Sequence, residues 1–73
     1  MTQVKAAEIV QPIALSSIPK GEYKGLWTGY VAKAVINGEI FRFTTEDSVR
    51  GLKVSCKIII EESSIEVRVD KEE

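Results

Sequence analysis

The sequence predicts a small all-β domain, an antiparallel meander of four to five strands curled into a barrel-like or sandwich-like sheet, with at most one short helical turn. An Asn-Gly pair, Asn37-Gly38, lies between two apolar-rich runs, which is the strongest short-range signal for a β-hairpin. Farther along, residues 52–60 and 65–70 alternate apolar and polar side chains with the period of a half-buried strand. These two observations give the fold class.

Residues 1–19 are interpreted as an N-terminal segment with one candidate edge strand at 8–15. Pro12 cannot donate a hydrogen bond to a sheet, so this stretch belongs at an edge or contains a break. The sequence leaves open whether residues 8–15 pair within the chain or with another copy. Pro19 and Gly21 then mark a turn, and the β domain, residues 20–70, begins there.

Residues 22–36 are interpreted as one long strand, interrupted at Gly25 and Gly29, where bulges or bends let a sheet curl. The Asn-Gly turn that follows fixes a register, because a two-residue type I′ turn needs positive φ at both central positions. The predicted pairs are Ile36 with Glu39, Val35 with Ile40, Ala34 with Phe41, Lys33 with Arg42 and Ala32 with Phe43.

The predicted register separates two faces of this hairpin, because side chains alternate along a strand. Ala32, Ala34, Phe41 and Phe43 share one face, and the small alanines leave room for the two rings. Lys33 lies opposite Arg42 on the other face, where two buried basic side chains would repel each other. We therefore expect the Phe face inside and the basic face outside.

The rest of the chain completes the domain with one helical turn and a second hairpin. Thr44 and Asp47 have capping-box spacing, and Gly51 can end a helix, which predicts a single turn between them. The strand at 52–60 then points its alternate apolar side chains, Cys56 among them, inward. A turn at 61–64 leads to residues 65–70, where Ile65, Val67 and Val69 face the core. Residues 71–73 are expected to be a disordered tail.

Composition argues against an enzyme and against a metal or cofactor site. The 73 residues contain one cysteine and no histidine, and the net charge is −1. A Ser-His or Cys-His pair and an ordinary zinc site are therefore ruled out. We expect no catalytic, metal-binding or cofactor-binding residue. With no secretory signal and no apolar run of about 20 residues, we expect a soluble, cytoplasmic protein.

The outward face of the hairpin is the candidate interaction face, because it mixes basic and β-branched side chains. Such a face is covered either by residues 8–15 of the same chain or by a second molecule. The short chain favours association, since small domains bury a modest part of their surface. We expect a protein-protein contact module that forms a homo-oligomer through this face. Its residues are Val31, Lys33, Val35, Ile40 and Arg42.

The alternative is a weak single-stranded nucleic-acid-binding module, similar to small barrels of the oligonucleotide-binding or SH3-like type, although no family motif is present. Aromatic rings can stack on bases while basic side chains contact phosphates. The candidate contacts are Trp27, Tyr30, Arg42 and Lys53. A structural role for Trp27, filling one end of the barrel, competes with this assignment, because so small a core needs its largest side chain.

Overall fold

The computed structural model describes residues 2–4, 7–10, 13–46 and 53–69, and this part of the chain is almost entirely β-structure, which confirms the fold class. The helical element within it is a single 3-10 turn, η1 (Leu15–Ser17). No helix in these ranges is long and apolar enough to cross a membrane. The strands are β1 (Thr2–Val4), β2 (Glu8–Ile9), β3 (Gly21–Trp27), β4 (Val31–Ile36), β5 (Glu39–Thr44), β6 (Val54–Ile60) and β7 (Ile65–Val69).

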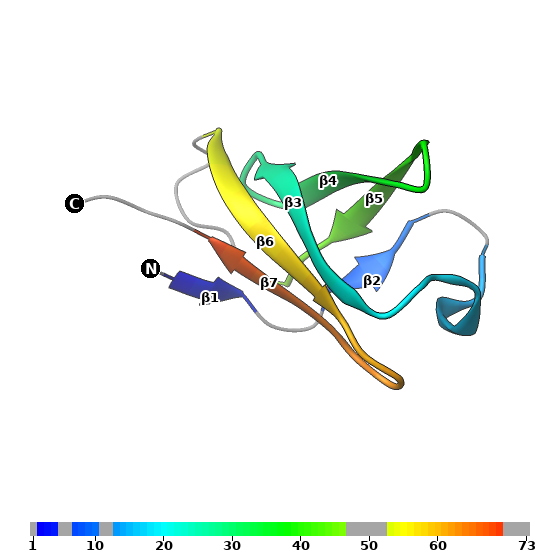
Figure 1. Cartoon of the computed structure of the whole chain (residues 1–73). Coiled ribbons are helices and arrows are strands. Elements are labelled where there is room, and N and C mark those ends of the chain that lie inside the picture. Colours follow the sequence, from blue (N-terminus) through cyan, green and yellow to red (C-terminus); the bar gives the residue numbers. More distant parts are fainter. Residues whose placement is uncertain (1, 5–6, 11–12, 47–52, 70–73) are drawn as a thin grey trace.

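The strands form one antiparallel sheet in the order β1-β7-β6-β3-β4-β5-β2 (Figure 1). The hairpin-linked strands β3, β4 and β5 follow one another, and β6 returns to lie beside β3. Those four strands therefore have Greek-key order. This differs from a simple meander because β6 lies beside β3 and not beside β5, the strand that precedes it in the chain. The sheet has seven strands, more than the four to five predicted: five longer ones, β3 to β7, and two short N-terminal ones at its edges.

The two edges of the sheet lie close together because consecutive segments of the chain form them. β1 pairs with β7 at one edge, and β2 pairs with β5 at the other. In a flat sheet of seven strands spaced ~4.8 Å apart, these edges would be roughly 29 Å apart. The four residue steps from Val4 to Glu8 span at most about 14 Å. The sheet must therefore curl, as the sequence predicts.

The Asn-Gly hairpin is confirmed residue by residue. Asn37 and Gly38 both have positive φ, 53° and 83°. All five predicted pairs between β4 and β5 are present, from Ile36 opposite Glu39 to Ala32 opposite Phe43. The Phe face is buried, and the side chains that close the core around it come from all five longer strands. The fully buried large side chains are Trp27, Ile36, Phe43, Ile58, Ile60, Val67 and Val69.

The single long strand predicted for residues 22–36 is wrong, because the chain reverses direction within it. β3 ends at Trp27, and β4 begins at Val31. The backbone N–H and the hydroxyl of Thr28 both donate to the carbonyl oxygen of Val31, at 2.9 and 3.2 Å. Gly29 takes a φ of 104°, a conformation that favours glycine. The reversal places Trp27 opposite Ala32, on the buried Phe face.

The last hairpin follows the predicted alternation. Cys56, Ile58 and Ile60 of β6 are buried, as are Val67 and Val69 of β7, whereas Ile65 is half-buried and packs against the core. Of the helical turn predicted between Thr44 and Gly51, Thr44 is the last residue of β5, and residues 47–51 lie outside the described residues, as does the tail at 71–73.

Candidate functional site: the outer face of the sheet

The convex side of β3, β4 and β5, which we call the outer face, carries the predicted interaction residues. Val35 and Ile40 face each other and remain 62% and 58% exposed. Lys33 and Arg42 are exposed beside them, and Val31 is half-buried opposite Thr44. The hairpin register therefore brings all five residues together on one face.

The described residues of the N-terminal segment, 2–4, 7–10 and 13–19, do not cover the outer face. Glu8 and Ile9 pair edge-on with β5, and the next residue continues that edge, since the Val10 N–H donates to the Arg42 carbonyl oxygen at 2.9 Å. Ile9 and Leu15 pack against the core instead. Two outcomes follow: residues 8–9 pair within their own chain, and the apolar side chains of the outer face stay exposed.

β3 adds two residues to the outer face that the sequence interpretation missed. Leu26 is 45% exposed and lies opposite Lys33, and Lys24 lies two residues before it on the same face. Together with β4 and β5 they form a shallow depression of about 420 Å³, which we call the aliphatic hollow. A turn at residues 28–30 pairs Leu26 with Lys33, so recognising that turn in the sequence would have predicted the hollow. Its lining residues are Lys24, Leu26, Lys33, Ala34, Val35 and Ile40.

Basic side chains cross the outer side of the sheet from strand to strand, and we call them the basic row. The pairings place Arg68 opposite Lys57, Lys57 opposite Lys24, and Lys33 opposite Arg42. Each of the five longer strands thus contributes one basic side chain. Like charges directly opposite each other destabilise a sheet. The row lowers stability unless other groups offset it.

Ion pairs offset one end of the basic row. Glu66 accepts a hydrogen bond from Arg68 Nε at 3.0 Å, and a Glu22 oxygen lies 3.7 Å from Lys57 Nζ. The four side chains are between 29% and 61% exposed to solvent, so each pair is worth at most about 1 kcal/mol. Within the described residues, Lys24 and Lys33 have no ion-pair partner. The uncompensated charge is therefore centred on the aliphatic hollow.

The predicted nucleic-acid contacts are not brought together, and one is buried. Trp27 is 0% exposed, so its ring is not accessible for stacking on a base in this structure. The indole fills the core, although its N–H has no acceptor among the described residues. Tyr30 is exposed at the turn before β4. Arg42 on β5 and Lys53 before β6 are exposed but separated by β3 and β4.

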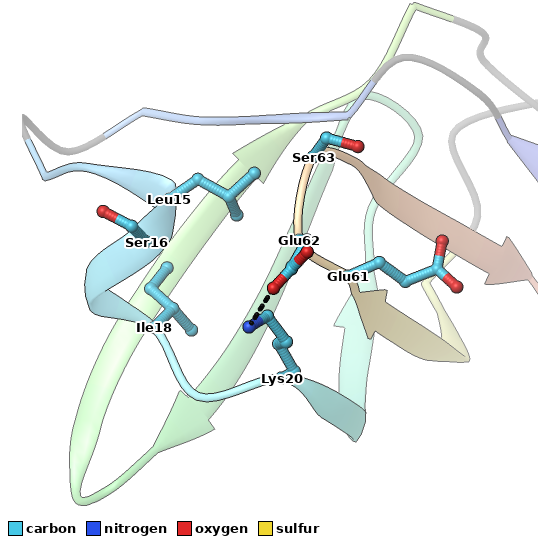
Figure 2. Close-up of a pocket in the computed structure, with 7 residues that line it drawn as sticks. All are labelled: Leu15, Ser16, Ile18, Lys20, Glu61, Glu62 and Ser63. Atoms are coloured by element: carbon cyan, nitrogen blue, oxygen red, sulfur yellow. Dashed lines mark hydrogen bonds and ion pairs between the residues drawn. The ribbon is translucent and has the colours of Figure 1, made fainter.

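A second depression, of about 380 Å³, lies beside η1 (Figure 2). Figure 2 shows Lys20 and Glu62 pointing toward each other, and their charged atoms are 3.0 Å apart. Ser64 donates a hydrogen bond to Glu61 at 3.1 Å. These polar groups already bind one another. This depression therefore leaves fewer groups available to bind a ligand than the aliphatic hollow does. Its lining residues are Leu15, Ser16, Ile18, Lys20, Glu61, Glu62 and Ser63.

Cys56, the single cysteine, faces the interior and is buried. In the part of the chain that the structure describes, no three carboxylate or thiol side chains are grouped so that they could hold a metal ion. No family model matches the chain, and neither the curated proteins nor the solved structures include a significant match. The candidate site is therefore defined by the geometry of the outer face alone.

Proposed function

We propose that this protein is a non-enzymatic β module that acts through protein-protein contact, with the outer face as its interface. The observation that supports this function is the exposure of Leu26, Val35 and Ile40 around the aliphatic hollow. The described N-terminal residues do not cover these side chains. Contiguous exposed aliphatic side chains rimmed by polar groups are typical of interaction surfaces. Burying them releases about 25 cal/mol for each Å² of apolar surface.

Self-association is the simplest form of this contact and stays a prediction. Two copies that met through the outer face would bury their aliphatic hollows but would bring Lys33 and Arg42 close to the same residues of the partner. Like-charge contacts across an interface oppose binding and are screened by salt. Self-association through this face should therefore strengthen as the salt concentration rises.

The test is the oligomeric state of the double variant Val35→Ser/Ile40→Ser. In sedimentation velocity and in chemical cross-linking inside cells, we expect wild-type protein in complexes, with its own copies or with another protein. The double variant should be monomeric, because it lacks the apolar surface. Since both side chains are more than half exposed, its fold should be retained, and circular dichroism checks this.

A matched control is Ile13→Ser, which removes an aliphatic side chain that is 39% exposed but lies in another depression, beside Leu15 and Ile65. This control should assemble like wild type. Wild-type protein that stays monomeric at every concentration and gives the same cross-links as the double variant would contradict the proposed function.

A further inference from the structure

The basic row extends across most of the curled sheet and determines what the outer face can bind. Five strands at a spacing of ~4.8 Å give it a length of about 19 Å. Lys24 and Lys33, the third and fourth residues of the row, line the aliphatic hollow. An occupant must therefore supply negative charge and aliphatic surface at the same place.

A second copy of the same face supplies the aliphatic surface but not the negative charge. The five residues of the basic row are accompanied on the outward side of these strands by two acidic residues, Glu22 and Glu66, so that this side carries a charge of +3. Two such surfaces placed together would repel each other. Charge complementarity instead requires an acidic partner.

Single-stranded nucleic acid supplies the negative charge but not the aliphatic surface that the hollow requires. Its phosphates could pair with the row, yet its bases bind mainly by stacking on aromatic rings. The hollow is lined by aliphatic side chains, and the exposed ring of Tyr30 lies outside it. A protein segment can instead carry carboxylates and aliphatic side chains at neighbouring positions.

We propose that the outer face binds an acidic protein segment that carries aliphatic side chains, and this proposal rests on the proposed function. The carboxylates pair with Lys24 and Lys33, which have no ion-pair partner within the described residues. The aliphatic side chains of the segment cover Leu26, Val35 and Ile40. Binding of this kind weakens as salt is added, opposite to the response expected for self-association.

The experiment titrates the isotope-labelled protein with a short synthetic peptide that alternates Glu and Leu, followed by NMR. We expect the largest shifts at the amides of Leu26, Lys33 and Val35. Two control peptides, one with Ser in place of Leu and one with Lys in place of Glu, should not produce these shifts. Binding should also decrease as sodium chloride is added.

Charge reversal separates a specific site from a general attraction. Lys33→Glu should weaken peptide binding about tenfold, since it replaces an attractive charge with a repulsive one. Lys20→Glu changes the net charge equally but lies in the depression beside η1, so it should leave binding within about twofold. Equal weakening by both variants would overturn the proposal.

Two further probes identify competing ligands, a thymidine oligonucleotide and vesicles that contain phosphatidylserine. Shifts at the hollow with either probe, and none with the Glu-Leu peptide, would overturn the acidic-segment proposal. The proposed function is tested separately. If the double variant Val35→Ser/Ile40→Ser lacks the complexes that wild type forms while the peptide fails to bind, the outer face is an interface. The proposal that its partner is acidic is then wrong.

Discussion

Gly25 shows how one residue permits the tight curl of the sheet. It pairs with Ala34 on one side and with Cys56 on the other, in an unbroken ladder. A Cβ atom added there would lie 2.5 Å from the Lys33 carbonyl oxygen and 2.9 Å from Ile58 Cδ1. Gly25 therefore acts through close packing between neighbouring strands, and the bulge or bend that the sequence interpretation placed there is not needed.

Gly25→Ala should destabilise the protein by about 1–3 kcal/mol, the usual cost of overpacking a core. Urea denaturation measures the change. Adding Ile58→Val should not restore stability, because the nearest obstacle is a backbone oxygen and not the end of a side chain. Ser55→Ala, at an exposed position of β6, is the neutral control. A fully stable Gly25→Ala would show that the strands can separate freely at this point.

Lys33 illustrates a conflict between stability and the proposed binding. It lies directly opposite Arg42, so Lys33→Glu converts a like-charge pair into an opposite-charge pair. We expect the free energy of unfolding to rise by about 0.2–1 kcal/mol. The gain should shrink at high salt, as urea denaturation at two sodium chloride concentrations can measure. A loss of stability would mean that other contacts of Lys33 matter more than its repulsion from Arg42.

At the scale of elements, the β4-β5 hairpin depends on its turn. Asn37 has a φ of 53°, a left-handed conformation that Asn and Gly tolerate better than other residues. Asn37→Ala should therefore lower stability by about 1–2 kcal/mol, whereas Asn37→Gly should cost less. Thermal denaturation followed by circular dichroism compares the two. Equal losses would argue against backbone strain as the cause.

The same hairpin marks what sequence reasoning could predict. Asn37-Gly38 is a local signal with a fixed geometry, so the register, the buried Phe face and the exposed Val35 and Ile40 all followed from it. The turn at 28–30 has no comparable signature. Its Gly29 looked like a bulge, so the sequence interpretation missed the β3-β4 pairing and, with it, the contribution of Leu26 to the hollow.

At the scale of the whole molecule, residues 2–4 pair along one edge of the curled sheet and residues 8–9 along the other (Figure 1). The sequence predicted an edge strand at residues 8–15, of which Glu8 and Ile9 form β2, but not that neighbouring parts of the N-terminal segment would pair at both edges. Such pairing joins residues far apart along the chain, and no local pattern encodes it. The position of Ile9 against the core likewise became visible only in three dimensions.

Deleting residues 1–9 should expose the outer edges of β5 and β7 together. Unpaired strand edges promote association with other chains. We expect the truncated protein to unfold at lower urea concentration and to form larger species in gel filtration as its concentration rises. Ile9→Ser in the full chain is the milder comparison, because it removes a core contact but keeps both strand pairings. A truncated protein that remains monomeric and stable would mean that the edges are protected in another way.

The double pairing of residues 2–9 also bears on how the protein folds. During synthesis this segment leaves the ribosome before β5 and β7, the strands with which it pairs. Contacts between residues distant in sequence slow folding, because a long loop must close before they form. The β4-β5 hairpin can form early and locally, whereas the pairing of β1 at the far edge of the sheet must wait for β7. Until then, β1 has no partner strand and its backbone groups remain open to other chains.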